Sequence, residues 1–253
     1  HPFSYNKLEQ LENIIKNNKI GAVKMEVQRS EPPKSGFLEG VRRICDKNNI
    51  ILIFDECTSG FRENFGGLHK KYKIEPDMAM FGKALGNGYA ITAIIGKKEI
   101  MESAQSSFIS STFWTERIGP SAAIKTLEVM EKEKSWDTIT AKGEKLKDSW
   151  DKLGKKHLLP LKIGGLSSLA NFRFDSDNHN AYKTLISQEM LKKEFLSANC
   201  VYVSIAHNDD VIDSYLNALD EIFSLIKDCE EGRKDIDKLL ESEICHNGFK
   251  RLN

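Results

Sequence analysis

The 253-residue sequence has no excess of charge, because 37 lysines and arginines balance 37 aspartates and glutamates. A chain so balanced has no global field that would attract nucleic acid or an anionic membrane. It also contains no run of about 20 uncharged apolar residues and no charged-then-apolar leader, so we expect neither a membrane span nor a signal peptide. These absences favour a small molecule or another subunit as the partner.

Cysteine is scarce and irregularly placed. The five cysteines are odd in number and never spaced as C-x-x-C: Cys45, Cys57, Cys200, Cys229 and Cys245. This pattern argues against a disulfide framework and against a structural zinc site. We therefore expect a protein of the reducing cytoplasm that holds no metal.

The first half of the sequence alternates between helical and strand-like segments. Apolar spacing predicts helices over 5–18 and 37–48, and short apolar runs predict strands over 20–25, 50–54, 77–81 and 91–95. The run at 50–54 is too uniformly apolar for a half-exposed strand, so we expect it at the centre of a sheet, covered on both faces. The alternation indicates a layered α/β sheet.

The second half predicts a smaller α+β domain that follows long helices over 119–134 and 136–156. We expect its strands over 161–163, 169–174 and 201–205 and its helices over 181–193 and 211–227. We place the domain boundary between residues 133 and 134. Residues 1–133 then form the larger α/β part, which ends in a connector helix, and residues 134–253 form the small C-terminal domain.

The predicted strand at 50–54 runs into Asp55-Glu56, which places carboxylates at the carboxyl edge of a sheet. Open α/β proteins bind their ligands at this edge. One chemistry that uses such carboxylates is magnesium-dependent nucleotide hydrolysis, but it needs a G-x-x-x-x-G-K-[ST] loop that the sequence lacks. A second is pyridoxal phosphate catalysis, in which an aspartate keeps the pyridine nitrogen protonated and a lysine binds the cofactor aldehyde.

Lys83 is the candidate lysine. It follows the predicted strand at 77–81 directly and stands between Gly82 and the Gly86-Asn87-Gly88 turn. Small flanking residues let the backbone approach a bulky cofactor, and partial burial would make the amine more nucleophilic by lowering its pKa. The order of Asp55 and Lys83 and their shared sheet edge favour the pyridoxal phosphate hypothesis.

The strings LIFDECTSGFR (52–62) and PDMAMFGKALGNGY (76–89) resemble class III aminotransferases, above all the glutamate-1-semialdehyde 2,1-aminomutase-like branch. The strings PKSGFL (33–38) and STF (111–113), the latter followed by a helix at Gly119-Pro120, extend the resemblance. It implies the fold type I of pyridoxal-phosphate-dependent transferases, with an incomplete large-domain sheet and a smaller α+β C-terminal domain. It also implies a transaminase or an isomerase, the 2,1-aminomutase, that moves an amino group to or within a carbonyl substrate.

The resemblance also implies a role for individual residues. Asp55 would pair with the pyridinium nitrogen, and Lys83 would form the Schiff base and then shuttle the proton. Cys57 would pack against one face of the cofactor ring. Thr112 would reach the cofactor phosphate of a neighbouring subunit, which implies a homodimer that acts on a small-molecule amino donor and a carbonyl acceptor.

Other positions have a place near the site but no defined role. Glu26 and Glu56 match acidic positions close to it, and His207 ends a strand of the small domain as a structural or substrate-proximal residue. The stretch 114–117 (WTER) replaces a small, glycine-containing stretch of the family, which implies a different substrate size or polarity. Three further histidines stand in polar, turn-like sequence and are expected at the surface: His69, His157 and His179.

Relatives of about 400 residues or more carry an amino-terminal part with a glycine-serine phosphate loop and an aromatic residue that stacks on the cofactor ring. The sequence contains no match to this phosphate loop or to the segment that carries the stacking aromatic residue. We therefore expect the chain to hold the lysine and aspartate half of the cofactor site and to lack the amino-terminal part. The alternative is a noncatalytic fragment or subunit whose fold survives without a complete site.

Overall fold

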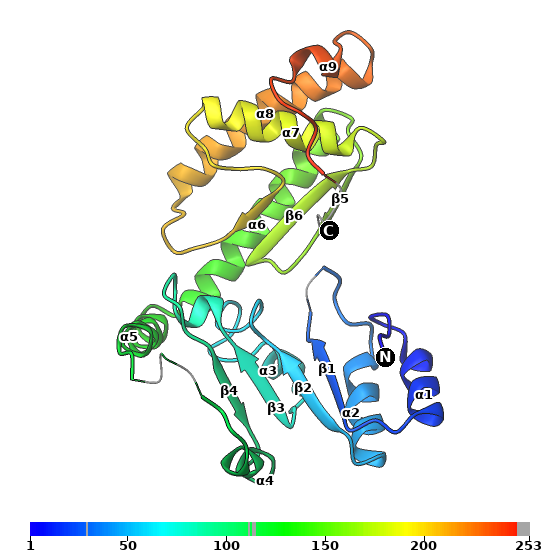
Figure 1. Cartoon of the computed structure of the whole chain (residues 1–253). Coiled ribbons are helices and arrows are strands. Elements are labelled where there is room, and N and C mark those ends of the chain that lie inside the picture. The colour runs from blue at the N-terminus through cyan, green and yellow to red at the C-terminus, as the bar shows by residue number, and fades with distance from the viewer. Residues whose placement is uncertain (29, 111, 113–114, 247–253) are drawn as a thin grey trace. The chain divides into compact units, whose positions relative to one another are not determined.

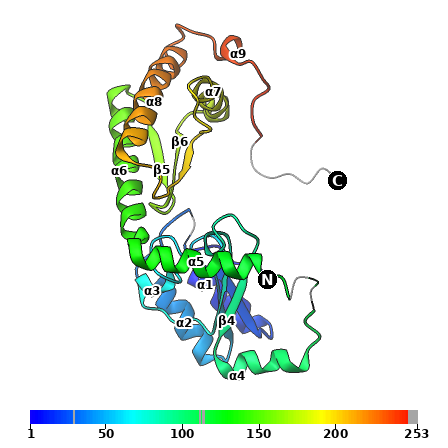
Figure 2. The same ribbon diagram turned by 90° about the vertical axis from the view of Figure 1, so that its left-hand side faces the viewer.

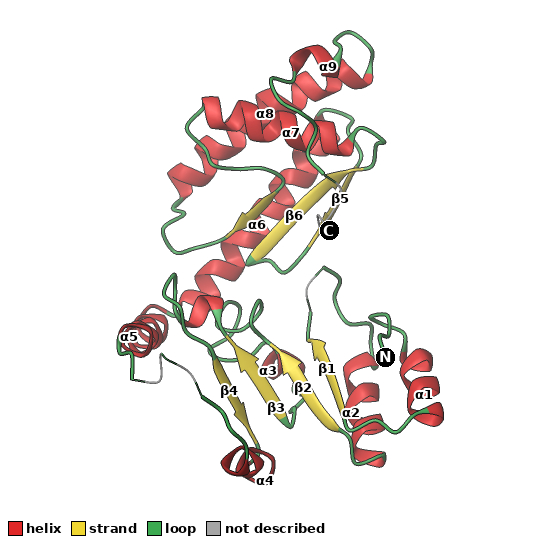
Figure 3. Cartoon of the chain, in the orientation of Figure 1, coloured by secondary structure: helices red, strands yellow, loops and turns green. Residues whose placement is uncertain are grey.

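The computed structural model describes residues 1–28, 30–110, 112 and 115–246 (Figure 1). The chain divides into two compact units, His1–Thr138 and Ile139–Asn253. Each unit has a sheet of its own, drawn as yellow arrows in Figure 3. Among the described residues, no helix is long and apolar enough to cross a bilayer.

The first unit holds a four-stranded sheet in the order β1-β2-β3-β4. Its strands are β1 (Ala22–Glu26), β2 (Ile51–Asp55), β3 (Met78–Phe81) and β4 (Ala93–Gly96). The first three strands are parallel, and β4 pairs antiparallel to β3. Since parallel strands end at the same edge, β1, β2 and β3 deliver their carboxyl ends to one side of the unit.

The first unit also contains helices and short 3-10 turns: α1 (Leu8–Asn17), α2 (Phe37–Lys47), α3 (His69–Tyr72), η1 (Lys83–Leu85), α4 (Lys98–Met101), η2 (Glu102–Ser106) and α5 (Ile118–Glu133). In α2 the apolar residues Leu38 and Val41 are buried, as the amphipathic spacing predicts. Helices α1 and α2 lie side by side (Figure 1), because Gly40 leaves room for the Leu8 side chain. A Cβ atom at position 40 would lie 2.4 Å from a methyl carbon of Leu8.

The two faces of the first sheet differ in burial. In β2, Leu52 and Phe54 are buried, whereas Ile51 and Ile53 are half-exposed. The expectation that the run at 50–54 is covered on both faces is therefore wrong for the described residues. The strand is central in its pairing but buried on one face only, and an apolar run cannot by itself distinguish these two situations.

The second unit is α+β, as expected. Its antiparallel sheet has the order β5 (Leu161–Gly164), β6 (Leu169–Phe174) and β7 (Cys200–Tyr202). Its helices are most of α6 (Ser135–Lys156), whose first turn belongs to the first unit, and α7 (His179–Lys192), α8 (Asp209–Glu230) and α9 (Ile236–Leu239). Helices α6 and α8 lie side by side (Figure 2), and the Trp150 indole N–H donates to the Tyr215 hydroxyl at 3.2 Å. Trp150 also packs on Phe172, with 4.9 Å between the ring centroids.

The structure confirms the predicted elements at 5–18, 20–25, 37–48, 77–81, 119–134 and 136–156, with ends that differ by a few residues. Among the described residues it also contains five short elements that no apolar pattern predicted, namely α3, η1, α4, η2 and α9. The assignment of cofactor binding to residues 1–133, and of a separate small domain to residues 134–253, stays a prediction.

Candidate active site

The carboxyl ends of the parallel strands bring the predicted site residues together. Asp55 is the last residue of β2, and it lies in register with Glu26 of β1 and Met80 of β3. Lys83 follows β3 after a single glycine and begins the short turn η1. Because β2 and β3 are adjacent and parallel, the carboxylate and the amine emerge from neighbouring strands at one edge.

Lys83 adopts a backbone conformation that is unusual for its residue type. Its φ angle is +43°, in the left-handed region that non-glycine residues enter at a cost of about 1 kcal/mol or more. Its ammonium group donates a hydrogen bond to the Thr58 hydroxyl at 2.8 Å. The guanidinium of Arg62 in turn donates to the Thr58 carbonyl at 2.7 Å. The loop after β2 therefore holds the Lys83 amine close to the strand that carries Asp55.

Asp55 is an ionised carboxylate with donors on both oxygens. Its Oδ1 accepts the Cys57 N–H at 3.2 Å, and its Oδ2 lies 2.9 Å from the Lys24 ammonium nitrogen. Partial burial alone would raise the pKa of Asp55, but the hydrogen bonds from Lys24 and Cys57 hold it below its usual value. The side chain is therefore negative at neutral pH and attracts a cationic group.

The Cys57 thiol lies close enough to Asp55 for a hydrogen bond. Partial burial and a hydrogen bond to Asp55 raise its pKa, and the positive charges of Lys83 and Lys24 act in the opposite direction. A thiol that is protonated at neutral pH is a weak nucleophile and a small apolar surface. This state fits the expected packing against a ring better than it fits covalent catalysis.

Glu56 points away from these groups into the interior of the unit, where its side chain is fully buried. Its carboxylate accepts hydrogen bonds from the Ser59 hydroxyl at 2.5 Å and from the His69 backbone N–H and ring Nδ1, each at 2.9 Å. Burial would raise the pKa of Glu56, but these hydrogen bonds keep it below its usual value. Glu56 therefore fixes the loop that follows Asp55.

The burial of His69 corrects the expectation that this residue lies at the surface. Its side chain is buried against Glu56, because a buried carboxylate needs donors and the ring supplies one. His157 is also mostly buried, with its Nε2 2.6 Å from Asp220. Polar, turn-like sequence did not reveal these partners, which lie 13 and 63 positions away.

Two further predicted positions are Thr112 and Glu26. Thr112 is exposed in a turn between η2 and α5, and Ser111, Phe113 and Trp114 lie outside the described residues. The contact of Thr112 with a neighbouring subunit's phosphate stays a prediction. Glu26 lies at the same sheet edge as Asp55 and has polar partners of its own.

His207 belongs to the second unit. Its ring Nδ1 accepts the Ser204 backbone N–H at 3.3 Å, which requires the tautomer protonated on Nε2. Partial burial and the positive charge of Lys142 lower its pKa from the usual 6.5. Because the folded-state pKa is lowered, the neutral ring stabilises the unit above pH 6.5, and this contribution is lost as the pH falls through the lowered value.

We predict that NMR titration will place the His207 pKa below 6.5, and that Lys142→Met will move it part of the way back. Lys152→Met removes an exposed lysine of the same helix and is the matched control. The same His207 pKa in the wild-type and Lys142→Met proteins would show that the charge of Lys142 does not lower it.

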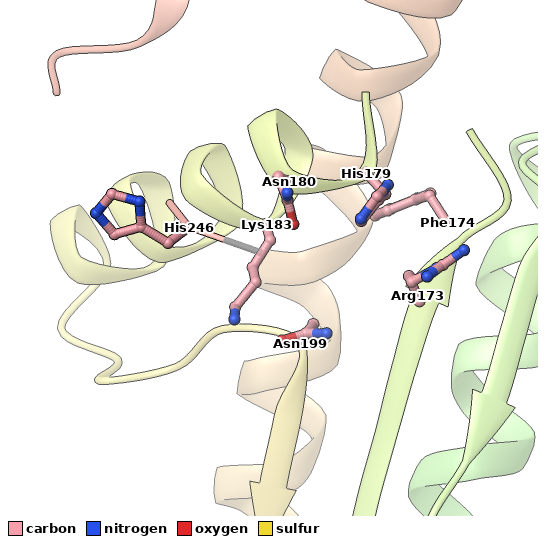
Figure 4. A pocket seen from close by; sticks show the side chains of 7 residues that line it. All are labelled: Arg173, Phe174, His179, Asn180, Lys183, Asn199 and His246. Carbon is pink, nitrogen blue, oxygen red and sulfur yellow. The ribbon is translucent and has the colours of Figure 1, made fainter. Parts of the chain in front are cut away.

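A polar pocket of about 230 Å³ lies in the second unit between β6 and α7 (Figure 4). Its lining residues are mostly cationic or amide side chains: Arg173, Phe174, His179, Asn180, Lys183, Asn199 and His246. In Figure 4 the Lys183 amine points towards Asn199, whereas the side chains of Arg173 and His246 diverge. The lining groups do not converge on one point, and none of the residues predicted for the site takes part.

The comparisons with known proteins concern the fold and the family of the chain. A Sphingopyxis sp. MTA144 FumI protein, solved in a PLP form, matches 95% of this chain with a TM-score of 0.83 and 23% identity. A transaminase with PLP bound matches 92% of it with a TM-score of 0.79. The fold is therefore that of the transaminases, an α/β fold with a mixed sheet, as the resemblance implied.

The sequence profile of aminotransferase class-III matches residues 4–220, and the chain belongs to this family. It is 33% identical over 241 residues to the 3-aminobutyryl-CoA aminotransferase of Cloacimonas acidaminovorans, a match that covers 90% of this chain and 58% of the relative. It is 31% identical over 239 residues to a glutamate-1-semialdehyde 2,1-aminomutase of Methanococcus maripaludis, covering 85% and 56%. The chain thus spans less than three fifths of these relatives.

Proposed function

We propose that this chain supplies the lysine and aspartate groups of a pyridoxal phosphate site in an aminotransferase or 2,1-aminomutase. The observation that carries the proposal is the cluster at the carboxyl edge of β2 and β3. There an ionised Asp55, a protonated Cys57 thiol and the Lys83 amine come together. A carboxylate, a small apolar surface and an amine are the groups that a cationic pyridine ring with an aldehyde substituent requires.

Pyridoxal phosphate, when bound, supplies an electron sink for the carbon next to the amino group of a substrate. The residues of this chain then have separate tasks. Asp55 would accept a hydrogen bond from the ring nitrogen and keep it protonated. Lys83 would hold the aldehyde through its amine, with loss of water, and would later move a proton. The Thr58 hydroxyl holds that amine in place while it is free, because it already accepts a hydrogen bond from it.

The substrates proposed are a small-molecule amino donor and a carbonyl acceptor. Both named relatives rearrange or transfer an amino group, although their printed names give different substrates. We also propose a homodimer, in which Thr112 of one subunit contacts the cofactor phosphate of the other. A cytoplasmic location is proposed because all five cysteines are free thiols, as in a reducing compartment.

Cofactor attachment tests this function directly. The protein is incubated with pyridoxal phosphate and reduced with borohydride, and the modified peptide is mapped by mass spectrometry. We expect a single adduct on Lys83, absent from Lys83→Ala and unchanged in Lys98→Ala, which removes an exposed lysine of α4. Labelling scattered over surface lysines, or none, would instead favour the noncatalytic alternative for this chain.

A further inference from the structure

Lys24 is the charged residue that the sequence pattern did not associate with the site. It interrupts the apolar run of β1 and lies two residues before Glu26, so both side chains point to the same face of the sheet. That is the half-exposed face, and Asp55 lies on it in register with Glu26. The ammonium nitrogen of Lys24 consequently reaches Oδ2 of Asp55 at 2.9 Å.

This ion pair occupies the carboxylate that the proposed function assigns to the cofactor ring nitrogen. Oδ1 of Asp55 accepts the Cys57 N–H, and Oδ2 pairs with Lys24. The Lys24 side chain is 53% exposed and that of Asp55 is 23% exposed. An ion pair so close to water is weak, so the Lys24 ammonium can move away from Asp55. Before another cation binds Asp55, the carboxylate must either lose Lys24 or pair with both cations.

We propose that Lys24 competes with the ring nitrogen of the cofactor for Asp55 and so weakens the selectivity of the site for a protonated pyridine ring. The inference rests on the proposed function. A protonated ring nitrogen that donates to Asp55 places a second positive charge within a few ångströms of the Lys24 ammonium, and like charges at that distance repel. Lys24 is therefore a specificity-determining residue that acts through Asp55.

The test compares two probes in three proteins. The probes are pyridoxal phosphate and its 1-deaza analogue, in which a carbon replaces the ring nitrogen. The proteins are the wild type, Lys24→Met and Lys19→Met, which removes the exposed lysine just before β1. We expect Lys24→Met to lower the Kd of pyridoxal phosphate about two- to fivefold. A change of this size corresponds to the free energy that an exposed ion pair contributes. The Kd of the analogue should not fall, and Lys19→Met should not tighten either probe.

The analogue carries the same phosphate and the same aldehyde, so a general change in electrostatic attraction would affect both probes alike. Equal Kd values for pyridoxal phosphate in the wild-type and Lys24→Met proteins would overturn the inference, as would equal tightening of the two probes. If equal Kd values accompany a borohydride adduct on Lys83, the proposed function still holds. If neither protein forms that adduct, the proposed function fails, and the inference fails with it.

A cofactor-free measurement tests the ion pair itself. The hydrogen bond with Asp55 raises the pKa of Lys24, so the amine is less reactive than a free lysine at the same pH. In Asp55→Asn we expect Lys24 to react faster with acetic anhydride, measured by quantitative peptide mass spectrometry with Lys19 as the internal reference. An unchanged ratio of the two rates would show that Asp55 does not hold Lys24, and the competition would be ruled out.

Discussion

Replacement of Glu56 by leucine is expected to destabilise the first unit by about 3 kcal/mol or more, because each buried donor that loses its acceptor costs about 1–3 kcal/mol. The Ser59 hydroxyl, the His69 N–H and the His69 ring would all lose their acceptor inside the unit. This loss is a large part of the free energy of unfolding of a typical domain, about 5–15 kcal/mol. Urea unfolding followed by circular dichroism, with hydrogen exchange of the peptides over 51–72, measures the change.

A more conservative substitution tests the charge of Glu56 without changing the size of its side chain. Glu56→Gln keeps the size of the side chain but removes the ionisation. Because the folded-state pKa of Glu56 is lowered, its ionised form stabilises the protein above its usual pKa, and this contribution is lost as the pH falls through the lowered value. The wild-type and Glu56→Gln proteins should therefore differ in free energy of unfolding at pH 7 and converge in acid. A difference that persists unchanged at low pH would contradict this explanation.

The position of the site was predictable because it depends on local sequence. An apolar run that ends in Asp55 and a second run that ends just before Lys83 define two strand ends. Parallel strands carry their carboxyl ends to one edge, so the sequence order placed the two groups together before any contact was known. The spacing of apolar residues likewise indicated α1, α2 and the long helices α5 and α6.

The partners of the site residues could not be predicted in the same way. Lys24 and Asp55 meet only because β1 and β2 pair in one particular register, which a single strand does not reveal. His69 stands in polar sequence that favours the surface, and its burial depends on Glu56, 13 positions earlier. Period-2 alternation around Lys24 was the available signal, since it places this charge on the same face as Glu26.

Under the proposed function, Asp55→Asn is expected to lower turnover about 10²- to 10³-fold, the loss typical of removing one electrostatic stabiliser. A neutral amide would not keep the ring nitrogen of a bound cofactor protonated, so Asp55→Asn would weaken the electron sink that the cofactor supplies. The measurement is the steady-state release of keto acid from a panel of amino acids and amines. Asp46→Asn, which changes an exposed carboxylate of α2, is the matched control.

The loss of turnover in Asp55→Asn should not come from unfolding. The amide oxygen still accepts the Cys57 N–H, and the pair with the exposed Lys24 contributes only about 0–1 kcal/mol to stability. We therefore expect a near wild-type urea midpoint and an unchanged borohydride adduct on Lys83, together with the slower reaction. Because the proposed function assigns Lys83 to the aldehyde and Asp55 to the ring nitrogen, attachment and turnover should separate in this variant. Wild-type turnover in Asp55→Asn would remove Asp55 from the proposed chemistry.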